Sequence, residues 1–119
     1  MAANALRREA LLDAAIAVLA ERGTRGLTFR AVDANAGTPV GTPSNYFANR
    51  DELIAQVFEQ IGVRLAPDPD EVDRLSQRPP SKELFADYVR YLVTRLSAER
   101  AVTIALFELR LEASRNPRI

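Results

Sequence analysis

The sequence predicts an all-α fold. Apolar residues recur at intervals of three and four in several segments, and capping residues, glycines and prolines separate these segments. No segment shows the strict alternation or the turn signals that strands and hairpins need. Hydrophobic residues make up 47% and charged residues 27% of the 119 positions, as in folded domains. At this length we expect one domain, or one small domain plus part of another.

The first two predicted helices are defined by their ends. Apolar residues from Leu6 onward recur at helical spacing, and this amphipathic helix ends at Gly23. Thr28 is a suitable N-cap for a second, short helix that runs through about Ala36. Gly37 then breaks that helix.

The start of the third helix has two candidates, because two Thr-Pro pairs follow, Thr38-Pro39 and Thr42-Pro43. Threonine caps helices and proline suits the first helical position. A helix that began at Pro39 would need an N–H from Pro43, which proline lacks. We therefore favour Thr42 as the N-cap and Pro43 as the first helical residue.

The next helix begins with a capping box, in which Asn49 is the cap and Glu52 follows three residues later. Its apolar stripe is Leu53, Ile54, Val57, Phe58, Ile61 and Leu65. We expect Val32, Phe47, Leu53 and Phe58 to lie in the core. Residues 67–80 are predicted to form an acidic, proline-bearing connection.

Two further helices follow this connection. Ser81 caps the first, and the second runs from about Ala101 to Ser114, before Asn116-Pro117 stops it. The last helix is apolar on several sides, which must all be covered. Its apolar residues are Val102, Ile104, Ala105, Leu106, Phe107, Leu109 and Leu111. We expect that the chain is part of a longer protein or depends on a partner surface; the alternative is a small bundle with this helix at its centre.

Composition excludes several classes of chemistry. The chain has no cysteine and no histidine, which excludes disulfides, thiolate metal sites, cysteine nucleophiles and every Ser-His-Asp triad. The sixteen carboxylates are scattered and show no EF-hand spacing. We therefore expect no cofactor, no metal site and no enzymatic activity.

Charge and hydropathy point to a neutral protein without a membrane segment. Sixteen cations balance sixteen anions, so the whole chain lacks a strongly basic footprint. Residues 1–65 are also neutral, with seven cations and seven anions. No run of about 18 apolar residues and no secretory signal is present, so the expected location is the cytoplasm.

Three short helices within the first fifty residues, with a glycine-containing turn between the second and third, describe a helix-turn-helix unit. The segment from Thr28 to Leu53 resembles the N-terminal domain of the TetR/AcrR family of transcriptional regulators. The positions that match the family pattern are Ala36, Gly37, Gly41, Thr42, Tyr46, Phe47 and Leu53, with Arg50 in place of a lysine. The helices from Asp51 onward look like the start of the family's regulatory domain, although family members are usually longer.

The sequence also departs from the family pattern. The usual Val, Ser, Leu and Tyr are replaced by Thr38, Pro39, Pro43 and Ser44. Asp33 stands where a small alanine is usual. This carboxylate either pairs with Arg30 or accepts hydrogen bonds from the turn amides near Thr38.

The resemblance implies a DNA-binding surface around the third helix. The implied contact residues are Thr28, Thr38, Val40, Gly41, Thr42, Ser44, Asn45, Tyr46 and Arg50. By family position, Thr28, Ser44, Asn45, Tyr46 and Arg50 contact phosphates. Val40 is placed to touch a thymine methyl, and Asn45 is alternatively placed to pair with adenine. Gly41 either brings its backbone against the DNA or is a plain loop glycine.

The resemblance further implies a helix-turn-helix head at residues 1–50 and the N-terminal part of a helical ligand-binding and dimerisation domain at 51–119. Such a protein is a ligand-responsive regulator, expected to be a repressor, that binds a palindromic operator as a homodimer. Candidates for lining the effector pocket are Phe85, Tyr88, Tyr91, Leu92, Phe107 and Leu111, for which plain core packing is the alternative. The rival function is a helical protein-interaction module with a degenerate head that does not bind DNA.

Overall fold

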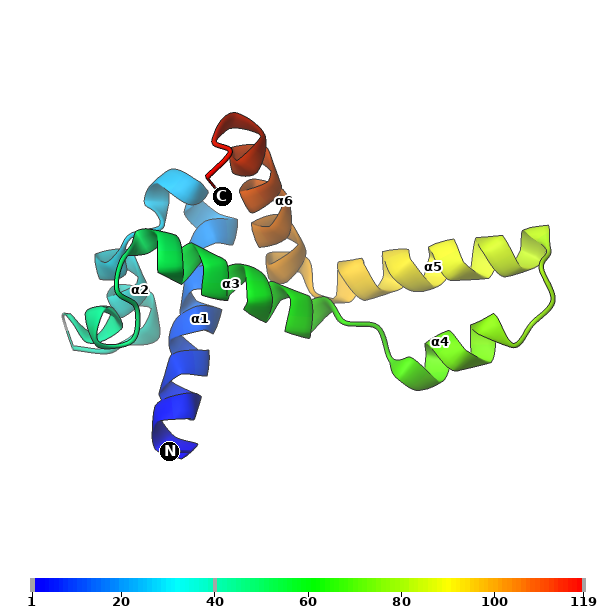
Figure 1. Ribbon diagram of the computed structural model, residues 1–119, viewed down its shortest axis with the longest axis horizontal. Coiled ribbons are helices and arrows are strands. Elements are labelled where there is room, and N and C mark those ends of the chain that lie inside the picture. The colour runs from blue at the N-terminus through cyan, green and yellow to red at the C-terminus, as the bar shows by residue number, and fades with distance from the viewer. Residues whose placement is uncertain (1, 40, 119) are drawn as a thin grey trace.

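The computed structural model describes residues 2–39 and 41–118, and it confirms the predicted all-α class: these residues form helices and turns, with no strand among them. The elements in chain order are α1 (Ala2–Arg22), the short 3-10 helix η1 (Thr24–Gly26), α2 (Phe29–Ala36), the 3-10 helix η2 (Thr42–Asn45), α3 (Arg50–Leu65), α4 (Pro69–Ser76), α5 (Lys82–Ala98) and α6 (Arg100–Arg115). Helices α2, α3 and α6 surround α1, whereas α4 and α5 extend away from them (Figure 1).

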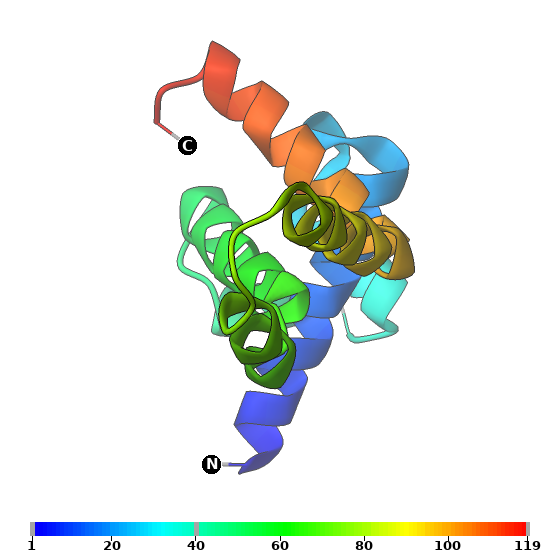
Figure 2. The same ribbon diagram turned by 90° about the vertical axis from the view of Figure 1, so that its right-hand side faces the viewer.

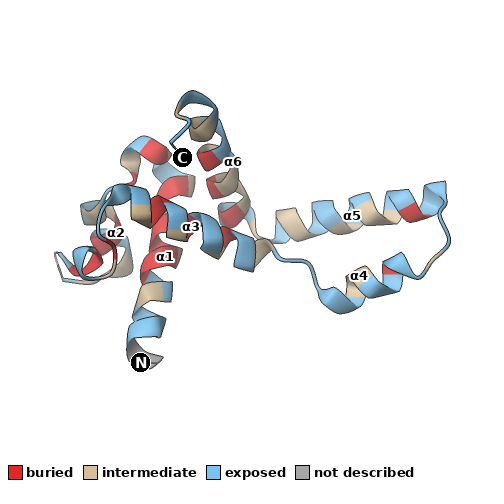
Figure 3. Cartoon of the chain, in the orientation of Figure 1, coloured by how far each residue is buried: buried red, intermediate tan, exposed pale blue. Residues whose placement is uncertain are grey.

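The core is built around α1, where the buried residues are concentrated (Figure 3). Leu11, Ala15 and Leu19, on one face of α1, are fully buried. The side chains that pack around them include Leu27, Val32, Phe47, Leu53, Val57, Ile61, Val102, Ala105 and Leu109. Burial of this apolar surface stabilises the fold by about 25 cal/mol for each Å² removed from water. One core therefore joins the first three helical segments to both α3 and α6.

The predicted helix ends are confirmed where local capping chemistry defines them. Gly23 (φ 73°) and Gly37 (φ 71°) both adopt the positive φ that favours glycine at a helix end. Thr28 caps α2 by accepting a hydrogen bond from the amide of Ala31, at 3.1 Å. Ser81 caps α5 in the same way, through the amide of Leu84.

The predicted capping box at the start of α3 is present in a modified form. Asn49 Oδ1 accepts from the amide of Glu52 at 2.9 Å, as predicted. The carboxylate of Glu52 reaches back to the amide of Ala48 at 3.0 Å, one residue before the cap. An ion pair between Asp13 on α1 and Arg64 on α3 joins these two helices near the far end of α3.

The connection predicted at residues 67–80 contains a helix that the sequence analysis missed, namely α4. Asp68 is its N-cap and accepts from the amide of Asp70 at 3.0 Å, while Pro69 occupies the first turn. An Asp-Pro pair starts a helix as readily as it ends one, because proline has no amide that needs a partner there. Leu75 of this helix is almost fully buried.

Helices α4 and α5 lie side by side and form a projecting arm, residues 69–98 (Figure 1), which Figure 2 views along its length. The described chain measures 54 × 36 × 22 Å with a radius of gyration of 16.9 Å, whereas a compact domain of this length has about 13–14 Å. At the arm's tip, Asp87 pairs with Arg78 and Arg90. The hydrogen bond from Arg78 holds the pKa of the Asp87 carboxyl below its usual value.

Two predictions about burial have different outcomes. Val32, Phe47 and Leu53 lie in the core as predicted, but Phe58 is 51% exposed, so its assignment to the core was wrong. Helix α3 buries Val57 instead, and this turns the neighbouring Phe58 toward the space between α3 and α6. On α6, Val102, Ala105 and Leu109 are buried, whereas Phe107 and Leu111 remain more than half exposed.

Candidate nucleic-acid interface

Residues 41–47, here named the polar turn, contain the segment predicted as the third helix. That segment forms a four-residue 3-10 helix, Thr42–Asn45, whose N-cap is Gly41, at φ 90°, and not Thr42. The hydroxyl of Thr42 instead donates to the carbonyl of Pro39 at 2.6 Å. The favoured start was therefore one residue too late, because glycine accepts the left-handed backbone that this turn requires.

Asp33 holds the beginning of the polar turn. The residue is 4% exposed, and its carboxylate accepts from the hydroxyl of Thr38 (3.0 Å) and from the amide of Gly41 (2.9 Å). Of the two alternatives for Asp33, the structure therefore shows contact with the turn rather than pairing with Arg30. The two donors satisfy a carboxylate that would be costly to bury alone.

The polar turn presents its middle to solvent. Ser44 and Asn45 are exposed, and the Ser44 hydroxyl donates to the carbonyl of Gly41 at 2.7 Å. Gly41 is also exposed, with no atom within 4 Å of the position that a Cβ would take. Backbone, hydroxyl and amide groups are thus available to an approaching surface at this point.

The end of the polar turn is held by a residue that the sequence analysis did not single out. Arg8 on α1 donates through Nη1 to the carbonyl of Tyr46 (3.2 Å) and to Oε1 of Gln56 (2.8 Å). Its guanidinium lies 5.4 Å from the ring centre of Tyr46 and 5.6 Å from that of Phe47. No local pattern could have identified Arg8, because its partners lie 38 and 48 residues away.

Arg50 contacts η1 rather than the polar turn. Its Nε donates to the carbonyl of Leu27 at 3.0 Å, and its Nη2 donates to the carbonyl of Thr24. Two of its nitrogens are therefore occupied within the protein. Thr28 is exposed at the start of α2, and Val40 lies outside the described residues.

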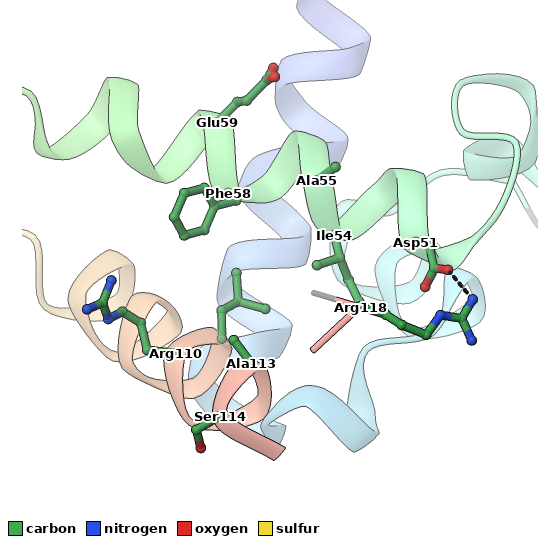
Figure 4. A pocket seen from close by; sticks show the side chains of 10 residues that line it. Asp51, Ile54, Ala55, Phe58, Glu59, Arg110, Ala113, Ser114 and Arg118 are labelled. Atoms are coloured by element: carbon green, nitrogen blue, oxygen red, sulfur yellow. Dashed lines mark hydrogen bonds and ion pairs between the residues drawn. The ribbon is translucent and has the colours of Figure 1, made fainter. Parts of the chain in front are cut away.

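A groove of about 730 Å³ lies between α3 and α6. Its lining residues are Asp51, Ile54, Ala55, Phe58, Glu59, Leu109, Arg110, Ala113, Ser114 and Arg118 (Figure 4). Arg118 pairs with Asp51 across one end, at 3.2 Å. The apolar part of the lining comes from Ile54 and Phe58 on one side and Leu109 and Ala113 on the other.

Comparison with known proteins assigns this arrangement to a family. The family model described as bacterial regulatory proteins, tetR family, matches residues 11–57. The model described as tetracyclin repressor-like, C-terminal domain, matches residues 80–119. The chain belongs to the tetR family. The polar turn and α2 both lie within the first match, whereas Arg8 precedes its first residue.

A solved structure supports the tetR-family fold over nearly the whole chain. The crystal structure of the multidrug binding protein EbrR complexed with imidazole is 31% identical, with a TM-score of 0.74. The match covers 94% of this chain and 62% of the EbrR chain, so this chain spans less than two thirds of the length of EbrR. No curated protein matches the sequence significantly.

The effector-pocket residues predicted from the tetR-family resemblance do not line the groove between α3 and α6. Phe85, Tyr88, Tyr91 and Leu92 lie on the arm, and the Tyr91 hydroxyl accepts from the amide of Asp68 at 2.8 Å. Phe107 lines a second, more open hollow of about 550 Å³ between α5 and α6. Leu111 is exposed on α6. Four of these six residues thus lie on α5 and two on α6, and none of them lines the groove between α3 and α6.

Two absences concern the described part of this tetR-family chain. Among those residues, no group of three or more Asp or Glu side chains is placed to hold a metal ion. None of the helices described is both long enough and apolar enough to cross a membrane.

Proposed function

We propose that this protein is a transcriptional regulator, with a head at residues 1–50 that binds operator DNA through the polar turn. The observation that carries the proposal is the exposure of Ser44 and Asn45 on a short helix held at both ends, by Asp33 and by Arg8. A polar segment that is held at both ends suits insertion into a major groove, where precise placement decides which base edges are contacted.

The proposed contacts divide into two kinds. Tyr46 and Thr28 supply hydroxyls, and Arg50 supplies a guanidinium, that can donate to phosphate oxygens. The Ser44 hydroxyl can do so once it releases the carbonyl of Gly41. Asn45 is the candidate for a base contact, since an asparagine amide pairs with adenine in the major groove. Because the first 65 residues are neutral, binding depends on these placed donors more than on bulk charge, and non-specific affinity should be modest.

We propose a homodimer that places two polar turns in successive major grooves, about 34–36 Å apart, on a palindromic operator. Residues 51–119 would begin the ligand-binding and dimerisation domain. An effector can release the DNA only if it binds better to the state in which the two heads no longer match the grooves. The protein would then act as a repressor.

The groove between α3 and α6 is the effector site that the geometry supports best. EbrR is described as a multidrug binding protein, and this favours a small organic ligand here. The groove offers apolar side chains with a charged pair at one end. These features are typical of ligand pockets. We therefore propose this groove, in place of the residues on the arm, as the leading candidate for the effector site.

The test is a gel shift and footprint with the full-length protein on DNA from upstream of its own gene. We expect a specific, salt-sensitive complex and a protected palindrome. The exposed apolar side chains of the arm, Phe85, Leu92 and Val93, favour the rival function, a protein-interaction module. The absence of any specific complex at low salt would support that rival.

A further inference from the structure

The conformation of the polar turn depends on contacts made from outside it. A 3-10 helix of four residues has poorer hydrogen-bond geometry than an α-helix, so contacts from other elements matter for its conformation. Its beginning is held by the carboxylate of Asp33, which accepts from the Gly41 amide. Its end is at Tyr46, whose carbonyl accepts from Arg8. The two ends are thus held from two different helices, α2 and α1.

Arg8 contacts Tyr46 in two ways at once. One Nη atom donates to the Tyr46 carbonyl, and the planar guanidinium lies over the ring of the same residue. It also lies over the ring of Phe47, which is 1% exposed and anchored in the core. The backbone and the ring of Tyr46 are therefore both fixed relative to α1.

Arg8 is itself held in place by α3. Its Nη1 donates to Gln56 Oε1 at 2.8 Å, and Gln56 Nε2 donates to Glu52 Oε1 at 3.1 Å. The other oxygen of Glu52 accepts from the Ala48 amide, just after the polar turn. This chain of hydrogen bonds runs from α1 through α3 and returns to the end of the turn.

We infer that Arg8 is a positioning residue for DNA binding: it sets the orientation of Tyr46 and of the polar turn, and does not itself bind phosphate. This inference rests on the proposed function. Its Nη1 donates to both a carbonyl and an amide oxygen, and its guanidinium lies over two aromatic rings. Lysine cannot replace it, because an ammonium lacks the planar fork that donates and stacks together.

The first test reads the position of Tyr46 without DNA. The full-length protein is labelled with 3-fluorotyrosine, and Tyr46→Phe identifies the ¹⁹F resonance of Tyr46. Arg8→Lys and Arg8→Gln should both shift this resonance, whereas the same changes at Arg7, its exposed neighbour on α1, should leave it in place. An unchanged Tyr46 resonance in both Arg8 variants would overturn the inference. If those variants fold poorly by circular dichroism, Gln56→Leu should shift the same resonance, and no shift would count equally against it.

The second test separates positioning from direct phosphate contact. For the footprinted duplex, Arg8→Lys and Arg8→Gln should each weaken binding at least tenfold, with the slope of log K against log[salt] unchanged and the affinity for an unrelated duplex retained. A direct phosphate contact predicts the reverse: Arg8→Lys binds normally, and Arg8→Gln lowers the slope by about 1.8, because a homodimer loses two phosphate contacts. If the wild-type protein binds no DNA, the proposed function fails, and the fluorine resonance alone decides whether Arg8 fixes Tyr46.

Discussion

The hydroxyl of Thr24 donates a hydrogen bond to Oε2 of Glu112, 3.2 Å away, and so joins η1 to α6. The carbonyl of the same threonine accepts from Arg50 at the start of α3. Gly23, beside it, lies so close to Glu108 that a Cβ there would be 3.1 Å from the carboxylate. The turn at residues 23–26 therefore follows α1 directly and contacts both α3 and α6.

The Thr24–Glu112 contact should be measurable as an energetic coupling. Thr24→Val removes the buried donor and Glu112→Met removes the acceptor, and each should destabilise the protein by about 1 kcal/mol. In a double-mutant cycle followed by urea denaturation, the pair should show a coupling of about 0.5–1 kcal/mol. The control pair, Thr24→Val with Arg110→Met at an exposed position of α6 that does not contact Thr24, should be additive. Additivity in both pairs would show that the contact contributes nothing.

Arg50 should matter for stability as well as for DNA. Arg50→Lys loses the two bonds to the carbonyls of Thr24 and Leu27 and should lower the free energy of unfolding by about 1–2 kcal/mol. Arg25→Lys, at an exposed position on η1, should leave it unchanged. Thermal and chemical denaturation measure both. Weakened DNA binding with no loss of stability would instead identify Arg50 as a phosphate contact alone.

The stability of the protein should depend on the two acceptor oxygens of Asp33. Asp33→Ala leaves the Gly41 amide and the Thr38 hydroxyl without their partner, at a cost of about 1–3 kcal/mol. Asp33→Asn retains one acceptor oxygen and should cost less. Hydrogen exchange of the Gly41 amide reports the contact directly, and exchange as slow in Asp33→Ala as in the wild type would contradict this assignment.

Two glycines provide a matched pair for backbone strain, because neither has an atom within 4 Å of the place that an added methyl group would occupy. Gly37, at φ 71°, should lose about 1 kcal/mol on substitution by alanine and less on substitution by asparagine. Gly62, inside α3, should gain about 0.5–1 kcal/mol from the same alanine change. Equal effects of the two alanine substitutions on the urea midpoint would refute this explanation.

The parts of the fold that could be predicted are those specified by neighbouring residues. The caps at Thr28, Asn49 and Ser81 use a side chain and an amide three residues apart, and all three are present. Helix α4 was missed because its prolines were interpreted as a break. Phe58 was assigned to the core because an apolar stripe does not show where its edge lies once α6 packs against α3.

The candidate site was harder to predict from the sequence, since its contacts are long-range. The motif located the polar turn and offered the correct partner for Asp33 as one of two alternatives. It could not show that Arg50 turns toward η1, because Thr24 and Leu27 approach it only in the folded chain. The role of Arg8 could not be predicted for the same reason, because its partners lie far away in the sequence.

The central claim, that the exposed side chains of the polar turn bind the operator, is tested most directly by fluorescence anisotropy on the footprinted duplex. The double variant Ser44→Ala/Asn45→Ala, with unchanged melting, should bind at least tenfold more weakly, which corresponds to about 1.4 kcal/mol. Gln77→Ala, which removes an exposed amide beside α4 on the arm, should bind like the wild type. Wild-type affinity in the Ser44/Asn45 double variant would contradict the account.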